Sequence, residues 1–170
     1  MEIRLARQDD ALAVETVRVH GWRAAYRQIL PPRELDAMLI DPRRWRDRFS
    51  DPPGGWTSLV AEEDGRVTGF AVVGPSRDEP RVGELYAIYV DPVTWSGGTG
   101  RALIEEAERR LADGYGVATL WVLAGNERAR RFYERAGWRL DGAAKVEVRW
   151  GVQAPEVRYR KYLDRASTDA

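Results

Sequence analysis

Cysteine is absent from the 170 residues, and the chain has one histidine, His20. The absence of cysteine excludes disulfides, thiolate nucleophiles and cysteine-based metal sites. A lone histidine on a helix is more often a packed or surface residue than a catalyst, and it cannot build a histidine cluster for zinc. No Gly-x-Ser-x-Gly segment is present to carry a hydrolase serine. The sequence therefore argues against thiol, zinc and serine-hydrolase chemistry, and it predicts no metal.

An excess of charge of either sign is also missing, because 27 basic residues balance 27 acidic ones. Nucleic-acid-binding domains carry a basic patch, whereas the arginine-rich stretch Arg43–Arg48 contains Asp47 and is typical of a solvated helix face. Apolar runs of signal-peptide or membrane-spanning length are missing as well. We therefore expect a soluble, cytoplasmic protein with no nucleic-acid partner and no membrane partner.

The hydrophobic pattern predicts a single α+β or mixed α/β domain over residues 1–165, followed by a disordered tail at 166–170. Asp9 or Asp10 can cap the first helix, and Asp64-Gly65 is a typical hairpin turn. The expected elements, in order, are a strand at 2–6, a helix to about 28, a helical stretch at about 33–50, strands at 57–63, 66–74 and 82–90, a helix at about 101–113, a strand at 117–123, a helix at about 127–136 that Gly137 ends, and two strands joined by a loop.

The most informative segment is Trp95–Arg101, in which three glycines lie between a strand and an amphipathic helix. Glycines let consecutive backbone N–H groups point into one concavity, and the following helix adds its dipole, so the segment can hold a phosphate or pyrophosphate. An ordinary tight turn is the alternative. A Walker A loop needs Gly-Lys-Ser/Thr, but Gly100 is followed by arginine, and a dinucleotide fingerprint needs a third glycine where Leu103 stands. Both of these phosphate motifs are excluded.

Two motifs in the correct order make residues 82–137 resemble the GNAT superfamily of N-acetyltransferases. The first is a strand ending in Val-Asp-Pro, followed by Gln/Arg-x-x-Gly-x-Gly/Ala, with Trp95 here in place of Gln or Arg. The second is an asparagine after the next strand, then a helix with a Phe-Tyr pair that ends at Gly-aromatic. The residues that carry the resemblance are Gly98, Gly100, Asn126, Phe132, Tyr133, Gly137 and Trp138, with Trp22, Tyr26 and Pro31 nearer the N-terminus.

This resemblance implies a mixed, mostly antiparallel sheet of about seven strands with about four helices, in which the central parallel strands splay apart. It also implies direct transfer of acetyl from acetyl-CoA to a primary amine. Tyr133 would donate a proton to the departing thiolate, and Glu84 would accept one from the amine. A backbone N–H near Ile88 or Val90 would polarise the thioester oxygen. The alternative role of Tyr133 is packing in the core. The alternatives for Glu84 are a solvent-facing position at the end of the strand, or a water chain that accepts the proton in its place.

The resemblance assigns binding residues too. The cofactor diphosphate would lie on the amides of residues 97–102, with Arg101, Arg128, Arg130 and Arg131 near this face, and the pantetheine arm would pair with Ile88–Val90. The acceptor would lie between about 22–36 and 142–155, where Glu34 and Asp36 could attract a cationic amine. The expected cofactor-binding residues are Ile88, Tyr89, Val90, Trp95, Ser96, Gly97, Gly98, Thr99, Gly100, Arg101, Ala102, Asn126, Ala129 and Tyr133, and the expected acceptor-binding residues are Trp22, Tyr26 and Glu84.

The sequence does not identify the acceptor, and three functions stay open. Acetylation of a small-molecule amine is favoured. Acetylation of a protein N-terminus or lysine, through a more open groove, is the second. The third is a non-catalytic acyl-CoA-binding module, against which the presence of Glu84 and Tyr133 argues. A homodimer is expected by family analogy alone.

Overall fold

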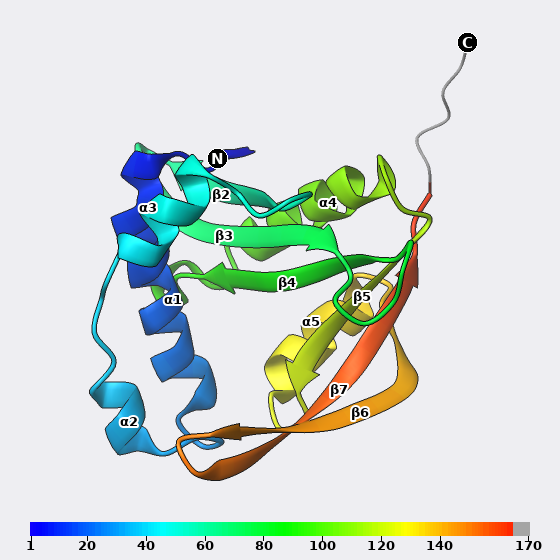
Figure 1. Ribbon diagram of the computed structural model, residues 1–170. Helices are drawn as coiled ribbons and strands as arrows, with labels where there is room; N and C mark the ends of the chain where they lie inside the picture. Colours follow the sequence, from blue (N-terminus) through cyan, green and yellow to red (C-terminus); the bar gives the residue numbers. More distant parts are fainter. Residues whose placement is uncertain (165–170) are drawn as a thin grey trace.

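The computed structural model describes residues 1–164, so residue 165 and the tail expected at 166–170 lie outside the described part. Its centre is one seven-stranded sheet in the order β1-β2-β3-β4-β5-β7-β6 (Figure 1). The pair β4–β5 is parallel, and the other neighbours are antiparallel. This confirms the predicted fold class. The strands are β1 (Glu2–Leu5), β2 (Thr57–Glu63), β3 (Arg66–Pro75), β4 (Gly83–Val90), β5 (Val117–Leu123), β6 (Arg139–Arg149) and β7 (Val152–Tyr162), and the helices are α1 (Ala11–Tyr26), α2 (Pro32–Asp36), α3 (Arg43–Ser50), α4 (Thr99–Ala112) and α5 (Glu127–Arg135).

Helices cover both faces of the sheet, because adjacent residues of a strand point to opposite sides. On one face Leu59 of β2 belongs to the same buried cluster as Leu103 of α4. On the other face Val60 shares a cluster with Val14 of α1. All four side chains are fully buried, and each such burial stabilises the fold by about 1.5–3 kcal/mol. The sheet is therefore packed between α1 and α4.

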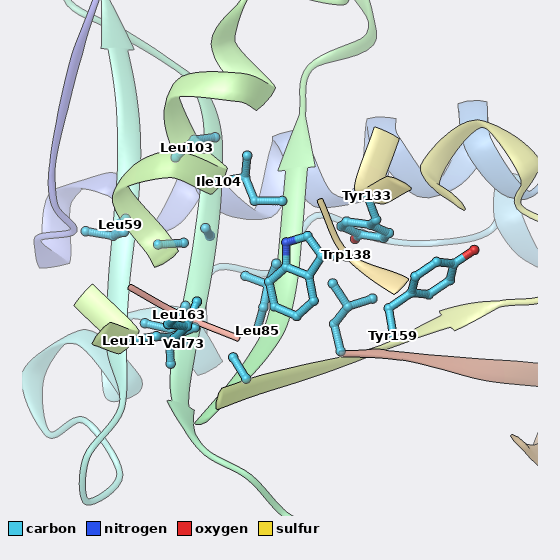
Figure 2. Packing of buried hydrophobic residues seen from close by; sticks show 14 of the residues in the cluster. Leu59, Val73, Leu85, Leu103, Ile104, Leu111, Tyr133, Trp138, Tyr159 and Leu163 are labelled. Atoms are coloured by element: carbon cyan, nitrogen blue, oxygen red, sulfur yellow. The ribbon is translucent and has the colours of Figure 1, made fainter. Parts of the chain in front are cut away.

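Trp138 closes the core where α5 leads into β6. Its fully buried indole lies among side chains that include Ile104 and Tyr159 (Figure 2). The indole N–H donates to Glu108 Oε1 at 2.8 Å, so the polar edge of the ring is satisfied. Gly137 before it has a φ of 89°, the left-handed conformation that glycine adopts readily after a helix. The predicted helix stop at Gly137 is thereby confirmed.

The parallel strands β4 and β5 separate after a short paired segment. Only Gly83–Ala118 and Glu84–Thr119 are in register in the ladder, although both strands continue for several residues. Figure 1 shows the two strands diverging toward their C-terminal ends. The splayed pair implied by the family resemblance is confirmed, and it leaves one edge of β4 without a strand partner.

The prediction of one helical stretch at 33–50 is wrong, because the chain forms two short helices, α2 and α3, with a break between them. The break contains Asp41-Pro42, because proline lacks an N–H and disfavours helical backbone in the residue before it. The first helix is also shorter than predicted and ends at Tyr26, whose carbonyl accepts from the amides of Ile29 and Leu30 at 2.9 and 2.8 Å.

No helix within residues 1–164 has the length and apolar character required to cross a membrane.

The segment 142–155 is a second correction, since it is not a loop. It consists of the adjoining ends of β6 and β7, which are joined by Trp150 and Gly151 alone. Both residues have positive φ values, 50° and 76°, as a two-residue hairpin turn requires. The acceptor wall that was predicted as a loop between the last two strands is therefore a regular two-stranded ribbon.

Candidate active site

A cavity of about 700 Å³ lies where β4 and β5 separate, and α1, α5, β6, β7 and the loop before α4 complete its walls. It therefore connects the α1 face of the sheet with the α4 face. The predicted site residues that line it are Trp22, Tyr26, Ile88, Tyr89, Val90, Trp95, Ser96, Gly98, Gly100, Arg101, Asn126, Ala129 and Tyr133. The predicted site residues outside its lining are Glu84, Gly97, Thr99 and Ala102.

The loop before α4 presents free backbone amides. Ser96 and Gly98 have φ values of 72° and 88°, which turn successive N–H groups in one direction. Within residues 1–164, the amides of residue 96 and residues 98–101 donate to no protein acceptor, whereas Gly97 N already donates to Thr94 O at 3.2 Å and Ala102 N to Gly98 O at 3.0 Å. The phosphate-binding segment predicted at 97–102 is therefore shorter, because only the amides of residues 98–101, at the start of α4, are available to bind an anion.

The unpaired edge of β4 offers further backbone groups. The indole N–H of Trp95 donates to Val90 O at 3.0 Å from the cavity side. The next amide, Asp91 N, donates to Thr68 O on the opposite side, next to β3. Because backbone groups of alternate strand residues point to the same edge, the N–H groups of Ile88 and Val90 face the gap.

Trp95 also supports an arginine. The guanidinium carbon of Arg128 lies 3.4 Å from the centroid of the Trp95 ring, and burial lowers the pKa of Arg128. No carboxylate of residues 1–164 pairs with Arg128, whereas Arg101 pairs with Glu105 and Arg131 with Glu127. The fourth candidate, Arg130, lies outside the cavity lining and binds Tyr159 Oη at 3.1 Å. Of the four predicted arginines, Arg128 is thus the one whose charge has no carboxylate or hydrogen-bond partner within residues 1–164.

Tyr133 lies on α5, which Asn126 caps by accepting a hydrogen bond from Ala129 N at 3.2 Å. The ring packs against Phe132 and against Tyr159, which is also labelled in Figure 2, and the side chain lines the cavity. Burial, with the nearby Tyr89 hydroxyl as a smaller cause, raises the pKa of Tyr133 well above its ordinary value. No side chain of residues 1–164 forms a hydrogen bond with its hydroxyl. Tyr133 therefore packs in the core, lines the cavity and has a hydroxyl without a hydrogen-bond partner in the described residues.

On the α1 face, three aromatic side chains form a hydrogen-bonded wall. Trp22 Nε1 donates to Tyr89 Oη at 2.9 Å, and Tyr26 Oη lies 3.4 Å from the same oxygen. Gly21 permits this approach, because a Cβ there would lie 3.2 Å from Tyr89 Cδ1. Tyr89, expected only at the cofactor, therefore directs its side chain toward α1.

The predicted acidic residues are not brought to the cavity. Glu84 is 1% exposed, and its carboxylate accepts from the Arg77 amide at 2.9 Å and from the Arg77 guanidinium. Asp36 pairs with Arg27 at 2.6 Å, and neither Asp36 nor Glu34 lines the cavity. Instead, the carboxylates of the lining are Glu147 and Glu156, which belong to β6 and β7.

The charged residues of this ribbon were not singled out from the sequence, although the acceptor was predicted to contact 142–155. Lys145, Glu147, Arg149 and Glu156 line the cavity together with Trp121 of β5. A signal was present, because Lys145, Glu147 and Arg149 alternate with Val146 and Val148, as expected for a strand with two different faces.

The sequence was compared with known proteins. A model of the acetyltransferase (GNAT) family matches residues 19–138. The chain belongs to the GNAT family. This GNAT chain is 31% identical over 171 residues to a probable N-acetyltransferase of Mycobacterium tuberculosis, and the match covers 95% of this chain and 94% of that protein.

Solved structures agree on the fold of this GNAT chain. YncA of Salmonella typhimurium with its cofactor acetyl-CoA has a TM-score of 0.76 at 23% identity, and the match covers 100% of this chain and 98% of that chain. The PaiA N-acetyltransferase of Thermoplasma acidophilum in complex with coenzyme A has a TM-score of 0.73 at 20% identity, covering 95% and 98%. The protein is an acetyl-CoA-dependent GNAT N-acetyltransferase. Its free amides at residues 98–101 and the open edge of β4 fit such a cofactor.

Proposed function

We propose that this GNAT enzyme transfers acetyl from acetyl-CoA directly to the primary amine of a small molecule. The observation that carries the proposal is one continuous cavity, which joins the free amides before α4 to the aromatic wall at Trp22 and Tyr26 through the gap between β4 and β5. A donor and an acceptor entering from opposite faces of the sheet can meet in this gap.

Acetyl-CoA supplies an acetyl group activated as a thioester. The amides of residues 98–101 hold its diphosphate, and Arg128, fixed by Trp95, adds a positive charge beside them. The N–H groups of Ile88 and Val90 bind the pantetheine arm as an added strand would and stabilise negative charge on the thioester oxygen.

Tyr133 protonates the departing sulfur. Its raised pKa keeps the phenol protonated at neutral pH, and its hydroxyl is free of protein partners among residues 1–164. A protonated phenol can donate a hydrogen bond to sulfur while the carbon–sulfur bond breaks. The carbon–nitrogen bond forms as the carbon–sulfur bond breaks. Tyr133 regains its proton from water and the amine releases one proton to water, so the protons balance. The predicted role of Glu84 as acceptor of that proton stays a prediction, and its bond to Arg77 supports a structural role instead.

The shape of the acceptor end supports a small molecule over a protein. The ring centroids of Trp22 and Trp150 lie 6.1 Å apart with an edge-to-face orientation, so the turn between β6 and β7 contacts α1. A polypeptide acceptor needs an open groove on this face, and this contact spans the groove. Acetylation of a protein N-terminus therefore requires Trp150 to move.

The test is acetyl-CoA binding by calorimetry, followed by an assay of free CoA with a panel of small amines and peptides. We expect binding and turnover of a small amine. Gly98→Ala should weaken acetyl-CoA binding about tenfold, because alanine at φ 88° costs about 1–2 kcal/mol although nothing lies within 4 Å of the added Cβ. Gly114→Ala is the matched control, since its Cβ also meets nothing and its φ is not positive. Binding without turnover across the panel would identify a non-catalytic module.

A further inference from the structure

The acceptor end of the cavity carries a cluster of charged residues built by the β6–β7 ribbon. Lys145, Glu147 and Arg149 alternate along β6 and line the cavity. Glu156 of β7 is the register partner of Lys145 and lines it too. Because side chains two apart on a strand share a face, the strand register alone brings these four groups together.

Within this cluster, Glu156 is buried between two cations. The residue is 8% exposed, and its carboxylate oxygens lie 3.5 Å from Lys145 Nζ and 3.6 Å from an Arg149 amino nitrogen. Lys145 Nζ lies 3.3 Å from Glu147. These distances exceed the usual hydrogen-bond range of about 2.7–3.2 Å, whereas the neighbouring ribbon pair Arg158–Asp141 is at 2.7 Å.

Both cations therefore keep unused donors at the cavity. Lysine has three donors and arginine five, and the long contacts to carboxylates satisfy few of them. Aromatic rings fix where these charges lie, since Lys145 Nζ is 4.4 Å from the centroid of Trp121 and the Arg149 guanidinium is 5.3 Å from that of Trp22. The cation–π attraction between such a group and the ring helps to hold the cation in this position.

We propose that the acceptor is an amine that also carries an anionic group, and that Lys145 and Arg149 bind this anion. This inference rests on the proposed function and names its substrate class. A carboxylate or phosphate-like group matches the planar donors of Arg149. Glu156 is already flanked by cations, so a second or third ammonium of a polyamine would find no free carboxylate. The cavity lining as a whole has seven lysine and arginine residues and two glutamates, which opposes polycations.

The test pairs each common L-amino acid with the amine that lacks its carboxylate, and adds spermidine as a polycation. We expect kcat/KM for the preferred amino acid to exceed that of its amine by at least tenfold. Arg149→Gln should lower kcat/KM for the amino acid at least tenfold through KM, and should change the matched amine less than twofold. Arg139→Gln is the control, because it lies on the same strand outside this cavity. Equal efficiency for the two members of each pair, or a preference for spermidine, would overturn the inference.

A binding measurement separates this inference from the proposed function. Calorimetry of the CoA-loaded enzyme should show the amino acid binding more tightly than its amine, and Arg149→Gln should abolish the difference while the Kd for acetyl-CoA stays within twofold. If no amine is acetylated but this difference is seen, the proposed function fails and the anion site stands. If amines are acetylated without any such difference, the function stands and the anion site fails.

Discussion

Arg77 holds the carboxylate of Glu84 from two directions. Its backbone N–H donates to Oε2 at 2.9 Å, and its Nε donates to Oε1 at 3.1 Å. The carboxylate is buried at the start of β4, beside the two register pairs that join β4 to β5. The pair therefore lies where the parallel strands meet, before they separate.

This relationship predicts the behaviour of Glu84→Gln. Since glutamine keeps an acceptor but loses the charge, we expect a loss of about 1–3 kcal/mol in the free energy of unfolding. The pH profile of kcat should keep its shape. Urea denaturation and a pH–rate profile check the two parts. Loss of the acid limb of the profile, where a carboxylate base would become protonated, without loss of stability would restore the role of Glu84 as the proton acceptor.

Tyr133→Phe removes the proposed proton donor without emptying the core. We expect kcat to fall by about 10²-fold, whereas the Kd for acetyl-CoA stays within threefold, because the ring still packs. Steady-state kinetics and calorimetry measure the two quantities. Tyr159→Phe is the matched control, since its hydroxyl binds Glu134 and Arg130 outside the cavity lining, and its kcat should be unchanged. Equal losses in kcat and binding would make Tyr133 a packing residue.

Arg128→Gln should weaken acetyl-CoA binding about tenfold, because a charge-assisted hydrogen bond to phosphate contributes about 1.5–3 kcal/mol. The affinity of the variant should also depend less on salt. Arg131→Gln is the control, since that arginine lines the same cavity but is paired with Glu127. Calorimetry at two salt concentrations measures both effects. A weakening as large in the Arg131 variant would show that only the summed charge matters.

Asp10 predicts a pH dependence of stability. Hydrogen bonds from Arg4 hold the pKa of this carboxyl below its usual value, and the Arg7 amide also donates to it, at 2.7 Å. The carboxylate therefore stabilises the fold above the unfolded-state pKa of about 3.9, and this stabilisation is lost as pH falls through the lower folded-state pKa.

We accordingly expect Asp10→Asn to lower the free energy of unfolding by about 1–3 kcal/mol at pH 7, and the difference from the native protein to shrink below about pH 4. Denaturant melts across this pH range measure it. Asp9→Asn, one residue earlier and exposed, is the control and should have little effect at either pH. A constant difference down to pH 2 would contradict the linkage.

Sequence patterns predicted the elements whose signals are local. The Asp64-Gly65 turn, the glycines before α4 and Gly137 after α5 each depend on neighbouring residues, and their elements formed where expected. The phosphate-binding potential of the glycine segment came from its residues, whereas the gap and Tyr133 came from the resemblance to the GNAT family. Most of the cofactor side of the cavity was therefore predictable.

The acceptor side was less predictable, because it is assembled by contacts distant in sequence. Glu84 could be placed on a strand from the sequence. Its hydrogen-bond partner Arg77 lies across a loop, and no local pattern predicts that Arg77 occupies the carboxylate. The charge cluster depends on the register of β6 with β7, which sets Glu156 beside Lys145. Register follows from the turn at Trp150-Gly151, and the sequence analysis had assigned that segment to a loop.

With the β6–β7 ribbon as the proposed acceptor wall, strand pairing constrains how this enzyme can change its selectivity. Substitution at 145, 147 or 149 alters one contact at a time, because these positions share a face. Insertion of a single residue within β6 would instead shift the strand register by one. Val146 and Val148, which are exposed, would then replace Lys145 and Arg149 on the cavity face. New acceptors are thus reached by point changes at odd-numbered positions, and changes of length are tolerated in pairs or at the hairpin tip.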